Sequence, residues 1–260
     1  MNKQLLKYKD VYTLIELLKR EVKDILKDEF IGLYIHGSLA LGDFDPKSSD
    51  IDFLVVTKDM VSQELFNSLR KMHNGILRKE NKWAYKLEGS YVSKDLLHSK
   101  IPPTEPRPYV NGREFSLEHY GYEWVLERYT LREYGIIIEG PNPQSFMDSI
   151  ASSELQQASL KILNQWWAPM LLNPNLLEER EYQVYAILTM CRILNMFKYG
   201  NVVSKKNAAE WAQNAFNNRW EVLIEKALRW KNDLPFDNLE ETLEIIKFTR
   251  SYVNNNLYIS

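Results

Sequence analysis

Two short runs of apolar residues flank a polar segment near the start of the chain. The first run covers residues 31–35 and the second covers residues 53–56. Both have the length and β-branched content of buried strands, and turn-forming residues bound them. They predict strands over 30–36 and 51–57, separated by acidic residues and a proline at 43–46 that favour a turn.

Helical and strand patterns alternate over the rest of the first half. Apolar residues at helical spacing predict a helix over 11–26, and a second helix is expected at about 60–78. Strands are predicted at 85–92 and, short and peripheral, at 135–139. Four prolines predict a stiff, irregular loop over 101–110.

After residue 150 the apolar positions follow helical spacing throughout. Gly200 has the position of a C-terminal helix cap, and Ser204 has that of an N-cap. The Gly-Pro-Asn-Pro segment at 140–143 marks the expected boundary between a domain 1–145 and a domain 146–260. The fold class expected is an α/β (α+β) domain with a small mixed sheet, followed by an all-α helical bundle domain. The bundle helices are predicted at about 155–172, 178–199, 204–216, 219–231 and 238–255.

Composition narrows the class of protein. The chain has 260 residues, 45% hydrophobic and 26% charged, as in soluble globular proteins. A net charge of −2 argues against a nucleic-acid partner and disfavours a template-directed polymerase, which needs a basic channel. No apolar run approaches the roughly 18 residues of a membrane span, and the N-terminus lacks a signal-peptide core, so we expect a cytoplasmic protein without a membrane partner. A monomer or homodimer is expected.

The single cysteine, Cys191, excludes an internal disulfide. It lies within an apolar helical pattern. A buried, inert thiol is therefore expected there in preference to a nucleophile.

Candidate chemistry lies between the first two predicted strands. Alternate residues of a strand share a face, so Asp50 and Asp52 project together toward the turn at Gly37 and Ser38. Two adjacent carboxylates repel each other, and Mg²⁺ relieves the repulsion. Gly37 allows close approach of a nucleotide, and Ser38 offers a hydroxyl and backbone N–H groups to phosphate. The alternative, a surface turn with two solvated aspartates, is disfavoured by the Gly-Ser spacing and the flanking strands.

Residues 34–56 read Tyr-Ile-His-Gly-Ser-Leu-Ala-Leu-Gly-Asp-Phe-Asp-Pro-Lys-Ser-Ser-Asp-Ile-Asp-Phe-Leu-Val-Val. They resemble the nucleotidyltransferase superfamily pattern of Gly-Ser, a further Gly and Asp-x-Asp. More closely, they resemble the streptomycin/spectinomycin adenylyltransferases, resistance enzymes that transfer AMP from ATP to an antibiotic hydroxyl. The resemblance implies a two-domain plan, Mg²⁺ on the aspartates, and ATP bound by Gly37, Ser38 and Ser49.

A third acidic residue is needed because the attacking hydroxyl must lose a proton. Glu88 lies in the predicted strand 85–92, and pairing of that strand with 51–57 would bring Glu88 near the aspartates. In the resembled family, a Leu-Glu on the third strand supplies the base and a possible metal ligand, and Leu87-Glu88 matches it. The alternative is an exposed strand glutamate.

The resemblance also implies triphosphate contacts in the helical half. The family carries an arginine at the position of Arg192 and a lysine at that of Lys205, which neutralise the leaving pyrophosphate. Lys206 is the alternative to Lys205. For Arg192 the alternative is a salt bridge at the domain interface.

The acceptor site is where the resemblance weakens. A cationic, hydroxyl-rich acceptor requires carboxylates and aromatic faces. Alignment on Arg192 places Tyr182 where the family has an acidic residue. Residues 114–120 differ from the family's tryptophan-containing motif, which favours spectinomycin over streptomycin. The remaining acceptor candidates are Glu178, Glu181 and Tyr185, with Trp166 and Trp167 as pocket walls or as core residues.

The sequence therefore predicts an ATP- and Mg²⁺-dependent adenylyltransferase acting on an aminoglycoside or aminocyclitol, with a role in antibiotic resistance. A second hypothesis keeps the chemistry and changes the acceptor to a lincosamide, a metabolite or a protein side chain. A third is a catalytically silent nucleotide-binding module. The presence of Asp50, Asp52 and Glu88 argues against the third hypothesis.

Overall fold

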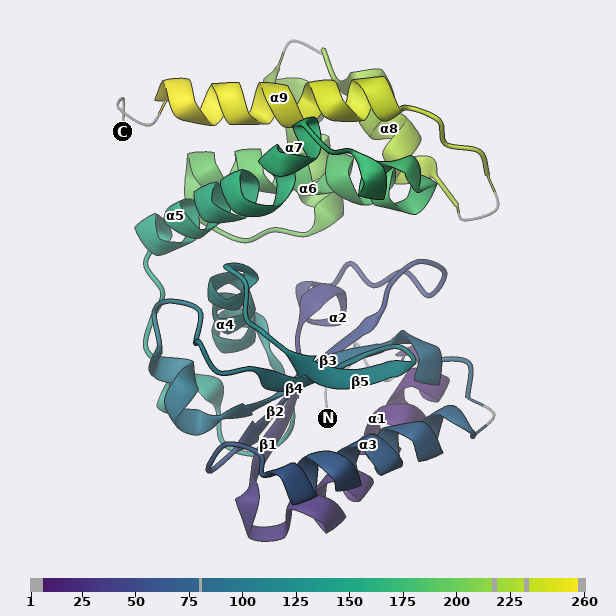
Figure 1. Ribbon diagram of the computed structural model, residues 1–260, viewed down its shortest axis with the longest axis vertical. Helices are drawn as coiled ribbons and strands as arrows, with labels where there is room; N and C mark the ends of the chain where they lie inside the picture. The colour runs from purple at the N-terminus through teal and green to yellow at the C-terminus, as the bar shows by residue number, and fades with distance from the viewer. Residues whose placement is uncertain (1–6, 80, 217–218, 232–233, 257–260) are drawn as a thin grey trace. The chain divides into compact units, whose positions relative to one another are not determined.

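The computed structural model describes residues 7–79, 81–216, 219–231 and 234–256 (Figure 1). The chain divides into two compact units, the first ending at Ser149 and the second beginning at Ile150. The boundary predicted from the sequence was 145/146.

The first unit contains a mixed sheet. Within the described residues six strands lie in the order β5-β4-β3-β2-β1-β6. β2 pairs with β3 in parallel, and the other neighbours are antiparallel. The strands are β1 (Phe30–Ile35), β2 (Ile51–Thr57), β3 (Leu87–Ser93), β4 (Arg107–Asn111), β5 (Glu114–Glu118) and β6 (Ile136–Glu139).

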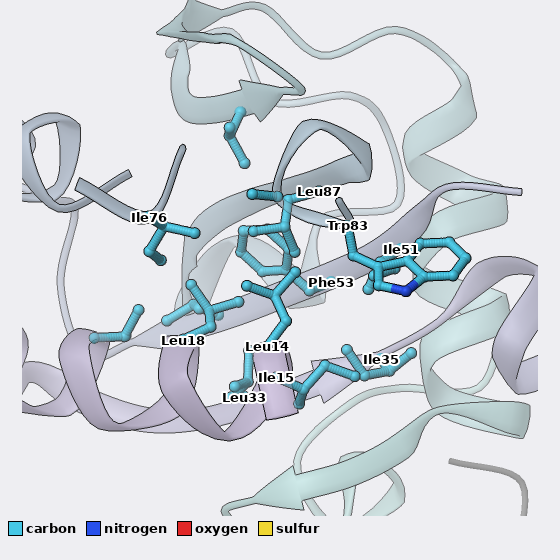
Figure 2. Close-up of a cluster of buried hydrophobic side chains, with 14 of the residues drawn as sticks. Leu14, Ile15, Leu18, Leu33, Ile35, Ile51, Phe53, Ile76, Trp83 and Leu87 are labelled. Carbon is cyan, nitrogen blue, oxygen red and sulfur yellow. The ribbon is translucent and has the colours of Figure 1, made fainter. Parts of the chain in front are cut away.

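Helices cover both faces of this sheet (Figure 1). Apolar residues of α1 and α3 pack on one face, in a core that includes Leu14, Phe53 and Leu87 (Figure 2). Trp124 and Leu131 of α4 pack with the other face. The helices are α1 (Lys9–Leu26), α2 (Gly37–Leu41), α3 (Gln63–Leu77) and α4 (Glu123–Tyr134), with short 3₁₀ turns η2 (Lys27–Glu29), η3 (Ala84–Lys86), η4 (Lys94–His98) and η5 (Pro143–Ser145).

The two central strands present different side chains to the two faces. In β2, Phe53 belongs to the core under α1 and α3, whereas Leu54 and Val56 belong to the cluster with α4. Because alternate residues share a face, Asp52 begins the row that faces α4. Glu88 begins the corresponding row of β3, two residues before the buried Ser90. The polar residues Asp52 and Glu88 therefore lie at the start of β2 and β3, at the end of the sheet next to α2.

The predicted strands at 30–36, 51–57, 85–92 and 135–139 are confirmed. The predicted irregular loop is present over 101–106, but the prediction was wrong for residues 107–110, which belong to β4. Pro108 is compatible with this strand because pairing with β3 begins only at Tyr109.

The second unit is helical, and the expected fold class is confirmed. Helix α6 contacts the other four long helices, and its C-terminus is capped by Gly200 at φ +62°. The Ser204 hydroxyl caps α7 by accepting a hydrogen bond from Asn207 N at 3.2 Å. The long helices are α5 (Ser152–Ile162), α6 (Arg180–Tyr199), α7 (Lys205–Ala215), α8 (Glu221–Arg229) and α9 (Leu239–Asn256).

The predicted helix 155–172 is continuous only to Ile162. The chain then widens into a short π-helix, η6 (Leu163–Trp167), and tightens into the 3₁₀ turn η7 (Ala168–Leu171), whose second residue is Pro169. A further 3₁₀ turn, η8 (Asn175–Glu178), precedes α6. Glu178 therefore lies outside the helix predicted to carry it.

Cys191 is buried, as predicted, and burial raises the pKa of its thiol to about 12. Among the helices that the structure describes, none has both the length and the apolar character needed to cross a bilayer.

Candidate active site

The turn between β1 and α2 brings bare backbone against an aspartate. Gly37 has φ +59°, and a β-carbon there would lie 1.9 Å from Oδ2 of Asp52. The backbone N–H of His36 donates to the carbonyl oxygen of Asp52 at 3.0 Å. Within the described part of the chain, Ser38 Oγ is buried and no hydrogen-bond partner is found for it. The bare backbone at Gly37, called the Gly37 cradle below, and the buried Ser38 hydroxyl thus lie together beside β1 and β2.

The loop before β2 is held by its own hydrogen bonds. The N–H of Ser49 donates to the carbonyl of Asp45 at 2.8 Å, and the N–H of Asp45 donates back to Ser49 Oγ at 3.0 Å. Nζ of Lys86 donates to the Ser49 carbonyl at 3.0 Å. This loop delivers Asp50, which is exposed, and then Asp52, which is half-buried. Sequence analysis did not select Lys86.

The parallel pairing of β2 with β3 places Glu88 directly beside Asp52. The strand adjacency expected from the sequence is therefore present. Glu88 is half-buried, and this burial raises the pKa of its carboxyl group. The hydroxyl of Tyr109 donates to Glu88 Oε1 and opposes that rise, whereas the nearby charges of Asp52 and Asp50 add to it.

A buried arginine lies on the same side of the sheet. Arg107 donates from Nε to Ser90 Oγ at 2.8 Å and from Nη1 to the carbonyl of His119 at 3.1 Å. Its Nη2 is 3.9 Å from Oε1 of Glu127, a half-buried residue of α4.

Negative charge collects around these groups. Burial lowers the pKa of His36, and the charges of Glu127 and Glu88 oppose that shift. Carboxylates gathered in this way favour a bound cation. The sequence did not predict three residues of this region: Tyr109, Arg107 and Glu127. The Asn-Gly pair at 111–112 is a hairpin signal that could have revealed β4.

The donor set suits a magnesium ion that is shared with a nucleotide. Mg²⁺ is commonly held by one or two carboxylates together with substrate phosphates. Asp50 and Asp52 provide that pair, and the missing side chain at Gly37 leaves room for the Asp52 carboxylate itself. Among the described residues, no group of three or more His, Cys, Asp or Glu side chains is arranged to hold a metal ion. A share of Glu88 in metal binding stays a prediction.

In the second unit, the two predicted phosphate contacts lie on successive helices. Arg192 is half-buried in the middle of α6, and Lys205 is the first residue of α7. Nζ of Lys205 lies 5.3 Å from the centre of the Tyr185 ring, so Lys205 lies against α6. The alternative, Lys206, is exposed and lies 3.9 Å from Glu210 of its own helix.

The aromatic acceptor candidates form one cluster. Tyr182, Tyr185 and Trp167 contact each other, with ring centres 5.3–5.7 Å apart. Trp166 Nε1 donates to the Tyr182 hydroxyl at 3.0 Å. Trp167 is buried as a core residue, whereas Trp166 is 48% exposed.

The acidic acceptor candidates stand on the surface. Glu181 is exposed in the first turn of α6, and Glu178 is exposed at the end of η8. The structure therefore brings Lys205 against Tyr185, which in turn contacts Tyr182.

Two family models match the chain. The nucleotidyltransferase domain matches residues 15–153, and the C-terminal domain of aminoglycoside adenylyltransferase matches residues 146–255. The chain is 26% identical to the spectinomycin 9-adenylyltransferase of Enterococcus faecalis over an alignment of 275 residues, which covers 96% of this chain and 97% of the relative.

A solved structure shares the fold. It is a crystal structure of a spectinomycin adenyltransferase from Enterococcus faecalis with ATP and spectinomycin. The TM-score is 0.73 at 17% sequence identity, and the match covers 94% of this chain and 99% of the other.

Proposed function

Because the chain belongs to the aminoglycoside adenylyltransferase family of nucleotidyltransferases, we propose that it transfers AMP from ATP to a hydroxyl group of a small cationic acceptor. The acceptor class is an aminoglycoside or aminocyclitol, with spectinomycin ahead of streptomycin. The observation that carries the proposal is the pairing of Asp52 with Glu88 next to the Gly37 cradle. It puts a metal-binding carboxylate and a candidate base on adjacent strands.

The first unit holds the nucleotide in this proposal. Asp50 and Asp52 hold Mg²⁺, which when bound offsets the negative charge of the phosphate oxygens. The bare backbone at Gly37 lets a phosphate approach, and the buried Ser38 hydroxyl donates to a phosphate oxygen. Ser49 is held in place for the same ligand by Asp45 and Lys86.

Glu88 is the proposed general base. Its half-buried carboxylate accepts the proton of the acceptor hydroxyl as that oxygen bonds to the α-phosphorus of ATP. The bond from the α-phosphorus to the bridging oxygen breaks, and pyrophosphate leaves with its electron pair. Burial raises the pKa of Glu88, and a base works best when its pKa lies near the operating pH.

The second unit supplies the remaining contacts in this proposal. Arg192 and Lys205 neutralise charge on the departing pyrophosphate. Tyr182 and Tyr185 present aromatic faces to the cationic acceptor, and Glu178 and Glu181 offer carboxylates to its ammonium groups. The contact between Lys205 and Tyr185 supports this assignment because it joins the two sets of residues.

A panel assay tests the proposal. ATP and Mg²⁺ are incubated with spectinomycin, streptomycin, other aminoglycosides and a lincosamide, and pyrophosphate release is measured. We expect release that depends on an aminoglycoside or aminocyclitol and that falls by the ~10²–10⁴-fold typical of losing a general base in Glu88→Gln.

Three other results of the panel assay would change the proposal. Pyrophosphate release with the lincosamide alone would mean that the acceptor is a lincosamide and not an aminoglycoside or aminocyclitol. ATP binding without any pyrophosphate release would indicate a catalytically silent nucleotide-binding module. Equal rates in wild type and Glu88→Gln would remove Glu88 from the role of base.

A further inference from the structure

Strand β4 extends the polar side of the sheet beyond Glu88. In the antiparallel register of β3 and β4, Asn111 is opposite Glu88 and Tyr109 is opposite Ser90. Opposite residues of an antiparallel pair share a face, and diagonal neighbours lie within reach of an aromatic side chain. Tyr109 is the diagonal neighbour of Glu88.

The phenol of Tyr109 meets this carboxylate directly. Its hydroxyl donates a hydrogen bond to Glu88 Oε1. Tyr109 is half-buried, and burial raises its pKa well above the ordinary value, so the phenol keeps its proton and is the donor. A phenol can supply one proton, and one carboxylate oxygen accepts it.

The Tyr109 ring is itself held in place. The guanidinium carbon of Arg107 lies 5.2 Å from the centre of the Tyr109 ring and 4.3 Å from that of Tyr120. Arg107 is fixed by its hydrogen bonds to Ser90 Oγ and to the His119 carbonyl. The phenol is therefore backed by a buried, hydrogen-bonded cation and is a rigid support.

We propose that Tyr109 is a positioning residue for Glu88, whose Oε1 it holds so that Oε2 faces the reacting hydroxyl. This inference rests on the proposed function, in which Glu88 is the base. The torsion that orients a glutamate carboxyl group is broad, so an unsupported base samples many directions. A hydrogen bond from a fixed partner narrows that range, and proton transfer depends on such alignment.

Tyr109→Phe tests the inference because it removes one oxygen and keeps the ring. We expect kcat to fall at least about tenfold, as for the loss of a hydrogen bond to a charged group. The KM for the acceptor and the Kd for Mg-ATP should each change by less than about twofold. A wild-type kcat, or a loss confined to KM, would overturn the positioning role.

Tyr91→Phe is the matched control. Tyr91 is also a buried tyrosine of this sheet, but its hydroxyl lies 2.8 Å from Nε2 of His73, among the core residues under α1 and α3. We expect its kcat to match wild type. An equal loss of kcat in Tyr91→Phe and Tyr109→Phe would mean that any removed tyrosine hydroxyl disturbs the sheet, and would overturn the inference.

A double-mutant cycle with Glu88→Ala completes the test. Without the carboxylate there is nothing to position, so Tyr109→Phe should lower kcat further by less than about twofold in that background. The same loss in both backgrounds would contradict the inference.

The same four proteins are also compared by denaturant unfolding, which needs no acceptor. If wild type adenylylates no acceptor, the proposed function has failed. The double-mutant cycle of unfolding free energies then decides whether Tyr109 holds Glu88. Non-additive changes in unfolding free energy support this contact, and additive changes overturn it.

Discussion

Gly37 is the residue at which the candidate site has least room. Its φ of +59° lies in the left-handed region, and a β-carbon would overlap the carboxylate of Asp52. We expect Gly37→Ala to destabilise the first unit by about 1 kcal/mol or more and to weaken Mg-ATP binding at least about tenfold. Thermal unfolding and calorimetric titration measure the two effects.

Gly75 offers a matched control for that substitution. It lies within α3, and a β-carbon there would meet nothing within 4 Å. Gly75→Ala should raise stability by about 0.5–1 kcal/mol, because alanine favours a helix, and should leave nucleotide affinity unchanged. Wild-type affinity in Gly37→Ala would contradict the phosphate role given to this turn.

A second residue-scale prediction concerns His73, on the opposite side of the sheet from the site. Its ring stacks on Phe53 and Phe115 and contacts the Tyr91 hydroxyl, and burial lowers its pKa to about 3. In the unfolded chain the His73 imidazole binds a proton near pH 6.5, whereas in the folded protein it stays neutral at that pH. Stability should therefore fall as the pH drops below about 6.5, by about 2 kcal/mol at about pH 5.

The double variant His73→Phe/Tyr91→Phe isolates this effect, because it removes the titrating group and its hydroxyl partner together. Unfolding free energies at about pH 7.5 and about pH 5 are compared with those of wild type. The variant should lack that part of the acid destabilisation. The same pH dependence in both proteins would mean that His73 is not buried in neutral form.

At the scale of elements, strong periodicity was enough to predict most of the fold. The apolar runs before and after the Asp-x-Asp give β1 and β2, and the capping residues Gly200 and Ser204 mark the end of α6 and the start of α7. The hairpin of β4 and β5 was missed because prolines lie before and within β4 and the outer strand β5 is largely polar. The π-helix after Ile162 was missed because the apolar pattern continues through it.

The same limit applies to the candidate site. Asp50, Asp52 and their turn follow from local spacing, and Glu88 follows from strand adjacency. Tyr109 and Glu127 are separated from the aspartates by many residues and reach the site only through β4 and α4. A single sequence gives no register for such distant partners.

An element-scale prediction concerns the start of α7. Ser204 Oγ accepts the N–H of Asn207, and Lys205 is the next residue after this cap. Ser204→Ala should destabilise the second unit by about 1 kcal/mol, as for other lost N-caps, and should also weaken ATP binding through Lys205. Thermal unfolding and titration with Mg-ATP measure both.

Ser62 caps α3 in the same way, through a hydrogen bond from Leu65 N at 3.3 Å. Ser62→Ala should show a similar loss of stability with unchanged ATP affinity. If Ser204→Ala and Ser62→Ala affect ATP binding equally, the first turn of α7 has no special role in the nucleotide site.

At the scale of the whole molecule, residues of both units are proposed to bind one nucleotide. An acceptor that uses the second unit should therefore bind more tightly when Mg-ATP is present than when it is absent. Isothermal titration with a nonreactive ATP analogue measures this coupling, and Arg192→Ala should abolish it. Equal acceptor affinities with and without nucleotide, together with wild-type ATP affinity in Arg192→Ala, would exclude the second unit from the nucleotide site.

We expect Asp50 and Asp52 to support AMP transfer to spectinomycin, the acceptor placed first above. Mass spectrometry of spectinomycin after incubation with ATP, Mg²⁺ and the protein tests it most directly, with Asp50→Asn and Asp52→Asn compared at equal concentration and with their folding checked by circular dichroism. We expect wild type to add one AMP unit to spectinomycin and both folded variants to add none, because each carboxylate is proposed to be a ligand of Mg²⁺. Spectinomycin left unmodified by wild type, or adenylylated by either variant at the wild-type rate, would contradict it.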